Sequence, residues 1–128
     1  MLSLVERGSR TIKDPERSQR PFNEPPILRM KLIDTHNHLY LEDFDPQQDE
    51  LIEVAKESGI DALLLPNVDT TTIERMHDLS DRYPDFAYPM MGLHPTSVDG
   101  HYAENLKVTE SWLGKRPYCG IGEIGIDL

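Results

Sequence analysis

An alternation of short apolar segments and amphipathic segments dominates the sequence from Met30 onward, in four units of about 25 residues with short connections. Strands are predicted over residues 30–39, 60–68, 86–94 and 118–127, and helices over 46–58, from 70–72 to 83, and over 103–113. Such an alternation is typical of parallel strands covered by helices. The fold class is therefore predicted to be α/β.

Start and stop residues delimit the predicted helices. Asp45 can cap the helix over 46–58, Pro46 suits its first turn, and Gly59 suits its end. The second helix is expected to stop before Pro84. The apolar faces are expected to comprise Leu51, Ile52, Val54 and Ala55 in the first helix, Ile73, Met76, Leu79 and Tyr83 in the second, and Leu106, Trp112 and Leu113 in the third.

Periodicity alone does not separate a barrel from an open, doubly wound sheet. No GxGxxG motif lies between the first strand and its helix, which disfavours a dinucleotide-binding fold. A complete (β/α)₈ barrel usually needs roughly 250 residues, whereas this chain has 128. Four units therefore suit part of a barrel or one small open sheet.

The first 29 residues differ in character from the rest. They contain four of the ten prolines and no sustained periodicity, so we expect a disordered or loosely attached extension before a domain over 30–128. Either Met30 is the natural initiator, or the extension is a genuine flexible tail.

Charge is distributed unevenly, with a net value of -10 for the chain. Residues 1–29 carry six Lys and Arg against four Asp and Glu, whereas residues 30–128 carry seven against nineteen. An acidic body disfavours broad electrostatic binding of nucleic acid. A phosphate substrate would need bound metal ions, or basic residues of another segment, to attract it.

Cys119 is the single cysteine, so an intramolecular disulfide is excluded and nothing indicates an oxidising compartment. The sequence has no apolar run near the roughly 20 residues of a membrane span. A cytoplasmic protein without a membrane partner is therefore expected.

Two histidines at the end of the first predicted strand are the strongest chemical feature. His36 and His38 would share one face of that strand, about 7 Å apart along the backbone. Paired imidazoles on a buried strand are costly unless they are hydrogen-bonded or metal-bound. Because imidazole suits divalent transition ions, the pair is a candidate chelate.

Glu123 lies in an apolar, glycine-rich strand segment, where a charged side chain needs a partner. A metal ion is one such partner, and a carboxylate can bridge two ions. A buried pair with Arg or Lys is the alternative. Gly122 and Gly125 would leave room for an ion or a substrate to approach the backbone.

Further polar residues follow the strands at the same level. Asp34 would orient a ligand histidine or serve as a turn or capping carboxylate, and His94 before Pro95 would line the site or lie in a loop. Asp127 is a candidate outer-sphere residue or helix cap. His77 and His101 are assigned no role.

Three segments, IDTHNHLYLEDF, MMGLHPTSV and GIGEIGIDL, resemble in order and spacing the motifs of TatD-related metal-dependent hydrolases. The resemblance covers residues 30–128 and implies the N-terminal half of a TIM (β/α)₈ barrel. It further implies that His36, His38 and Glu123 are metal ligands and that His94 contacts phosphate.

The implied activity is hydrolysis of DNA phosphodiester bonds by a water that divalent ions activate, with two Mg²⁺, Mn²⁺ or Zn²⁺ ions in a complete site. The family takes two more histidines and an activating aspartate from later strands, which these 128 residues do not contain. An alternative is therefore an inert fragment, or one half of a split barrel. Its partners would be a complementary half-barrel or further copies that associate through open sheet edges.

Overall fold

The computed structural model describes residues 30–126; the expectations for residues 1–29 and for Asp127 lie outside the described residues. The strands are β1 (Leu32–Asp34), β2 (Ile60–Pro66), β3 (Ala87–Met91) and β4 (Gly120–Ile121). The helices are α1 (Gln48–Glu57), α2 (Ile73–Arg82) and α3 (Tyr102–Leu113), with short 3-10 helices η2 (Glu42–Gln47) and η3 (Pro95–Ser97).

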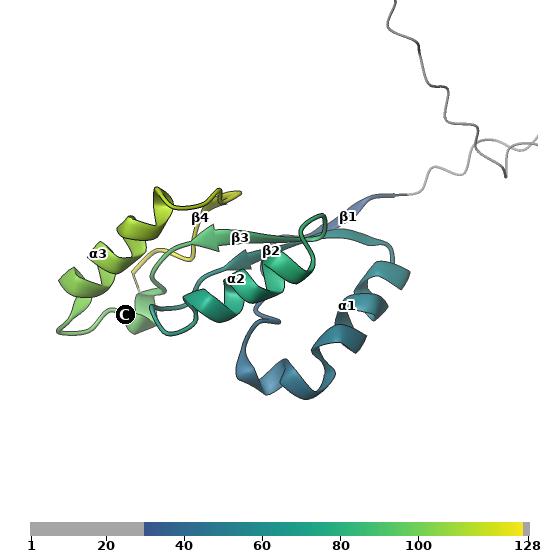
Figure 1. The fold of residues 1–128 in the computed structure, drawn as a ribbon, viewed down its shortest axis with the longest axis horizontal. Coiled ribbons are helices and arrows are strands. Elements are labelled where there is room, and N and C mark those ends of the chain that lie inside the picture. The colour runs from purple at the N-terminus through teal and green to yellow at the C-terminus, as the bar shows by residue number, and fades with distance from the viewer. Residues whose placement is uncertain (1–29, 127–128) are drawn as a thin grey trace, which may run out of the picture.

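The four strands form one parallel sheet in the order β1-β2-β3-β4. Each pair of neighbouring strands is joined by a crossover that contains a helix, and Figure 1 shows α1 and α2 lying together on one side of the strands. The predicted α/β architecture is confirmed. Because every strand points the same way, all carboxyl ends meet at one edge of the sheet.

The core lies between the sheet and its helices. Alternate residues of β3 are buried, as expected for a strand with one covered face. Leu63 and Leu65 of β2 are likewise buried at 1% and 0% exposure. The helices and the segment after β1 complete this core with Tyr40, Ile52, Ile73, Met76 and Leu79.

The start of helix α1 differs from the prediction that Asp45 caps it. The chain turns first into η2, which contains Pro46, and α1 then begins at Gln48 without a side-chain cap. Asp45 is therefore not a cap; its carboxylate pairs with Arg75 of α2 instead. Gly59 ends the helix as predicted, with φ of 89°, a conformation that side chains disfavour.

Helices α2 and α3 bury their predicted faces to different extents. Ile73, Met76 and Leu79 of α2 are buried. In α3 the prediction is wrong for Leu106 and Leu113, which are 49% and 42% exposed because little of the described chain packs beside them, whereas Trp112 contacts the core. Within residues 30–126 no helix is long and apolar enough to cross a bilayer.

The strands are shorter than predicted at their carboxyl ends. β1 stops at Asp34, β3 at Met91 and β4 at Ile121, so the candidate site residues lie in the loops that follow. At β1 the reason is local, because the Asp34 carboxylate accepts a bond from the backbone N–H of His36 and turns the chain away from the sheet.

Candidate metal centre

Loops from three strands converge at the carboxyl edge of the sheet. His36 and His38 follow β1, His94 follows β3, and Glu123 follows β4. β1 and β4 are the outermost strands, and in a flat sheet three strand spacings would separate them by about 14 Å. Nevertheless, His36 Nε2 lies 3.0 Å from Glu123 Oε2, because the sheet curls and the loops lean inward.

Three predicted site residues form one compact group. The ligand atoms of His36, His38 and Glu123 all lie within 4.8 Å of one another. The Nε2 atoms of the two histidines are 3.0 Å apart, and both residues lie in the loop after β1 and not in the strand that was predicted. The structure thus brings the three side chains together, although the predicted strand geometry is wrong.

The Glu123 carboxylate provides a test of whether a cation fits this group. Its Oε2 atom is buried and has no hydrogen-bond partner among the residues that the structure describes. His36 Nε2 and His38 Nε2 lie 3.0 and 3.7 Å from it, but neither is aligned as a donor. A buried carboxylate oxygen without a donor is costly. Two imidazoles and a carboxylate suit Zn²⁺ or Mn²⁺, so the residues fit a divalent ion.

His38 is held through its other ring nitrogen. Nδ1 lies 2.9 Å from the hydroxyl of Tyr40, which donates to the carbonyl oxygen of Pro66 at 2.5 Å. Burial, followed by the proximity of His36, lowers the pKa of His38 and favours the neutral imidazole that a metal needs. Tyr40 was not predicted as a site residue, although it continues the alternate spacing of His36 and His38 and could have been found from it.

The two ring nitrogens of His94 have different roles from those of a metal-binding histidine. Its Nδ1 accepts a hydrogen bond from the backbone N–H of Thr96 at 3.1 Å, so the ring proton of the neutral imidazole is placed on Nε2. That Nε2 lies 3.0 Å from Oε1 of Glu123. His94 therefore presents a donor to the site, in contrast to the lone pair that a metal ligand needs.

Asp34 contacts the backbone of the histidine loop. Its two oxygens accept from the N–H of His36 at 3.1 Å and from the side-chain amide of Asn37 at 2.9 Å. The alternative of a turn carboxylate therefore describes its contacts, whereas among the described residues its oxygens bond to no imidazole nitrogen. The reason is that the chain turns at Asp34, which brings the backbone N–H closer than the ring.

Asn67, at the carboxyl end of β2, was also missed. It is fully buried, and its amide donates to the carbonyl oxygens of Asp69 and Gly92, both at 2.9 Å. Its backbone N–H bonds to Met90 in β3, and its carbonyl oxygen accepts from the N–H of Glu123 at 3.5 Å. A polar residue at the end of an apolar strand was the sequence feature that could have identified it.

The remaining histidines lie away from this group. His77 of α2 is buried, with Nε2 2.9 Å from the hydroxyl of Tyr118 and its ring edge-on to Trp112. His101 is exposed and pairs with Glu104. Neither belongs to the group of His36, His38 and Glu123.

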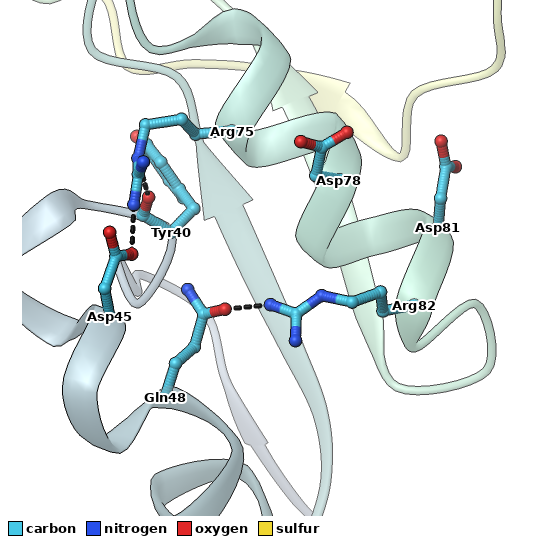
Figure 2. A pocket seen from close by; sticks show the side chains of 7 residues that line it. All are labelled: Tyr40, Asp45, Gln48, Arg75, Asp78, Asp81 and Arg82. Atoms are coloured by element: carbon cyan, nitrogen blue, oxygen red, sulfur yellow. Dashed lines mark hydrogen bonds and ion pairs between the residues drawn. The ribbon is translucent and has the colours of Figure 1, made fainter.

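A cavity of about 470 Å³ lies on the helical side of the sheet, between η2 with the start of α1 and helix α2 (Figure 2). Arg75 and Arg82 line it, but both are already engaged: Arg75 pairs with Asp45, and Arg82 binds Gln48 and Asp49. The cavity therefore offers no free cation for an anionic ligand, and the converging histidines and glutamate remain the chemical centre.

Comparison with known proteins gives a consistent result. Residues 33–128 match the family described as TatD related DNase. The chain is 32% identical over 96 residues to the uncharacterized metal-dependent hydrolase YabD of Bacillus subtilis, covering 75% of this chain and 37% of YabD. It is also 32% identical over 108 residues to human deoxyribonuclease TATDN3, covering 75% of this chain and 38% of that protein.

Structural comparison supports the same fold. The crystal structure of YJJV, a TatD homolog from Escherichia coli K12, matches with a TM-score of 0.68 and 28% identity, over 76% of this chain and 38% of that one. The parallel strands therefore form a curled half of the TIM-barrel fold, as predicted. The chain spans less than half the length of the relatives that it matches.

Proposed function

Since this chain belongs to the TatD-related DNase family, we propose that it provides the N-terminal part of a metal-dependent phosphodiesterase centre. Several relatives are named metal-dependent hydrolases or deoxyribonucleases, and one from Dickeya dadantii is named a 3'-5' ssDNA/RNA exonuclease. The proposed reaction is hydrolysis of a phosphodiester bond at a DNA 3′ end, and the proposed compartment is the cytoplasm.

The observation that carries the proposal is the unsatisfied Oε2 of Glu123 beside two imidazole nitrogens. In the proposed centre His36, His38 and Glu123 hold a divalent ion, either Mn²⁺, Mg²⁺ or Zn²⁺. When bound, such an ion supplies a water nucleophile at neutral pH and neutralises charge on the phosphate oxygens. The exposed fraction of the His36 side chain, 53%, leaves this edge of the site accessible to a substrate.

His94 serves a different part of the proposed centre. Its Nε2 lies 3.0 Å from Glu123 Oε1, and the proton on Nε2 is suited to donate to an oxygen of a phosphate that approaches the carboxylate. Oε2 of Glu123 is the carboxylate oxygen that has no hydrogen-bond partner among the described residues, and it is the atom proposed to bind the ion. These residues would thus hold one ion, and a second ion would need further ligands.

The net charge of -10 limits where a nucleic acid would bind. An acidic surface repels phosphates at a distance. The proposed substrate contact is therefore confined to the ion and to donors such as His94. So small a contact area suits an enzyme that acts on strand ends better than one that binds along a long duplex.

A second candidate function is one half of a split barrel, inert without its complement. In the part of the chain that the structure describes, the metal group has three members, His36, His38 and Glu123. β1 and β4 each pair on one side only, so each leaves an edge to which another strand can add. A complementary half-barrel is the proposed partner.

Metal binding by the 128-residue chain tests the first part of the proposal. Isothermal titration with Mn²⁺ or Zn²⁺ should show a site whose affinity falls at least about tenfold in Glu123→Gln, because each ligand contributes directly to the shell. His101→Ala is the matched control, since this exposed histidine lies outside the group. Unchanged affinity in Glu123→Gln would remove the basis of the proposed centre.

Nuclease activity tests the second part. The chain alone should release nucleotides from a single-stranded DNA 3′ end at the background rate. Adding a polypeptide that carries the later strands of a relative should restore metal-dependent release, and His36→Ala should abolish it. Metal-dependent release by the monomeric chain alone would instead support a self-sufficient enzyme and refute the split-barrel candidate.

A further inference from the structure

Tyr40 occupies a buried position directly behind the metal group. Its side chain is fully buried, and its hydroxyl lies between Nδ1 of His38 and the carbonyl oxygen of Pro66 at the end of β2. Tyrosine is not needed there for packing volume alone, because a phenylalanine ring would fill the same space. The hydroxyl therefore has to be explained by its two polar neighbours.

The directions of the two bonds follow from counting protons. A backbone carbonyl oxygen can only accept, so the single hydroxyl hydrogen of Tyr40 must point at Pro66. The hydroxyl oxygen is then an acceptor for His38, whose Nδ1 must carry the ring proton of the neutral imidazole. The lone pair is thereby left on Nε2, the nitrogen that faces His36 and Glu123.

Tyr40 is itself held at a second point. Arg75 of α2 donates from Nε to the Tyr40 carbonyl oxygen at 2.9 Å, and the same guanidinium pairs with Asp45 of η2 (Figure 2). The backbone of Tyr40 is thus tied to the helical layer while its hydroxyl is tied to the sheet. Such double anchoring fixes where the hydroxyl oxygen can lie.

We propose that Tyr40 is a positioning residue whose hydroxyl donates to the Pro66 carbonyl oxygen and accepts from Nδ1 of His38, a pair of bonds that we call the relay. The relay holds the His38 imidazole in the Nδ1–H tautomer, with Nε2 ready to bind the ion. Metal-bound histidines commonly donate their second N–H directly to a carbonyl or a carboxylate, which fixes the ring and raises its affinity. Here a tyrosine hydroxyl contacts both the ring and the carbonyl oxygen, and the Pro66 backbone also bonds to the imidazole directly. This inference rests on the proposed metal centre.

Nitrogen-15 NMR of the histidine rings in the metal-free chain tests the relay without any substitution. Long-range ¹H–¹⁵N correlation should show His38 with a protonated Nδ1 and an unprotonated Nε2, and His94 with the reverse pattern. In Tyr40→Phe, His38 should become a tautomer mixture while His94 stays unchanged. A His38 protonated at Nε2 in the unsubstituted chain would overturn the proposal.

Zinc affinity supplies the second measurement. Tyr40→Phe should weaken Zn²⁺ binding by about ten- to a hundredfold, the range found when an outer partner of a metal-bound histidine is removed. Tyr83→Phe is the matched control, because it removes a hydroxyl that binds Asp49 away from the site and should leave both measurements unchanged.

The outcomes separate the two proposals. If the unsubstituted chain binds Zn²⁺ and Tyr40→Phe binds it equally with an unaltered His38 tautomer, the relay fails and the metal centre stands. If the unsubstituted chain binds no Zn²⁺, the metal centre fails, and the role of Tyr40 in ligand positioning fails with it.

Discussion

Gly92, which follows β3, lies against the backbone of Gly122, which follows β4: a Cβ atom built on Gly92 would be 2.4 Å from the carbonyl carbon of Gly122. No side chain fits at that distance, and the atom in the way belongs to the backbone. The contact places the loop that carries Glu123 directly beside the loop that carries His94. The backbone of Gly122 can approach this closely only because Gly92 carries no side chain, whereas a Cβ on Gly122 would meet the side chain of Met90.

Replacing Gly92 with Ala should therefore destabilise the chain by about 1–3 kcal/mol, the usual cost of forcing atoms into a packed site. It should also weaken metal binding, because Glu123 adjoins Gly122. Thermal unfolding followed by circular dichroism measures the first effect and titration calorimetry the second. Gly100→Ala is the control: a Cβ there meets nothing within 4 Å, so stability should be unchanged or slightly higher. Equal stability of the two variants would contradict the packing argument.

His77 should make the stability of the chain depend on pH. Burial, followed by the nearby Arg116, lowers the pKa of His77 in the folded state. The unfolded chain then binds a proton more readily, so the contribution of the neutral ring is complete above the unfolded pKa of about 6.5 and is lost as pH falls from there toward the folded pKa.

Urea unfolding at several pH values should show this loss, and His77→Gln should have a smaller decline below pH of about 6.5 because it lacks the titrating ring. His101→Gln, at an exposed position, should decline as the unsubstituted chain does. If His77→Gln loses stability with acid as steeply as the unsubstituted chain, burial of His77 does not set this dependence.

The two sheet edges should drive association of the 128-residue chain. Ile33 of β1 and Ile121 of β4 are 57% and 56% exposed, beside strand edges that no described residue covers. Size-exclusion chromatography with light scattering should detect oligomers, which Ile33→Lys with Ile121→Lys should reduce, since charge on an edge opposes strand pairing. Val54→Lys, at a 50% exposed position on α1, should leave association unchanged. A monomeric unsubstituted chain would contradict the prediction.

The extension before Met30 is expected to contribute little to stability, given its proline content and lack of periodicity. A chain that begins at Met30 should unfold at the same midpoint to within about 4 °C, a shift that corresponds to roughly 1 kcal/mol for a domain of this size. Differential scanning calorimetry of both chains provides the measurement. A larger decrease would show that the extension packs on the domain.

The sequence predicted the sheet, its order of elements and the group of His36, His38 and Glu123, because periodicity and isolated polar residues report on burial. It did not predict where the strands end. Asp34 turns the chain because its carboxylate accepts a bond from the backbone N–H two residues later. Such a side-chain bond competes with the hydrogen bonds of the strand, and it does not alter the apolar periodicity from which strand ends are predicted. Tyr40 and Asn67 were missed for a related reason: their roles depend on partners 26 and 25 residues away in the chain.

The contact of His36 and His38 with Glu123 brings together residues that lie far apart along the chain. About 85 residues separate His38 from Glu123, so an ion held by both would act as a cross-link closing a long loop. A covalent link across a loop of that size removes up to about 4.5 kcal/mol of unfolded-state entropy in the simplest treatment. Chelation would therefore clamp the first strand to the fourth and stabilise the folded chain against unfolding.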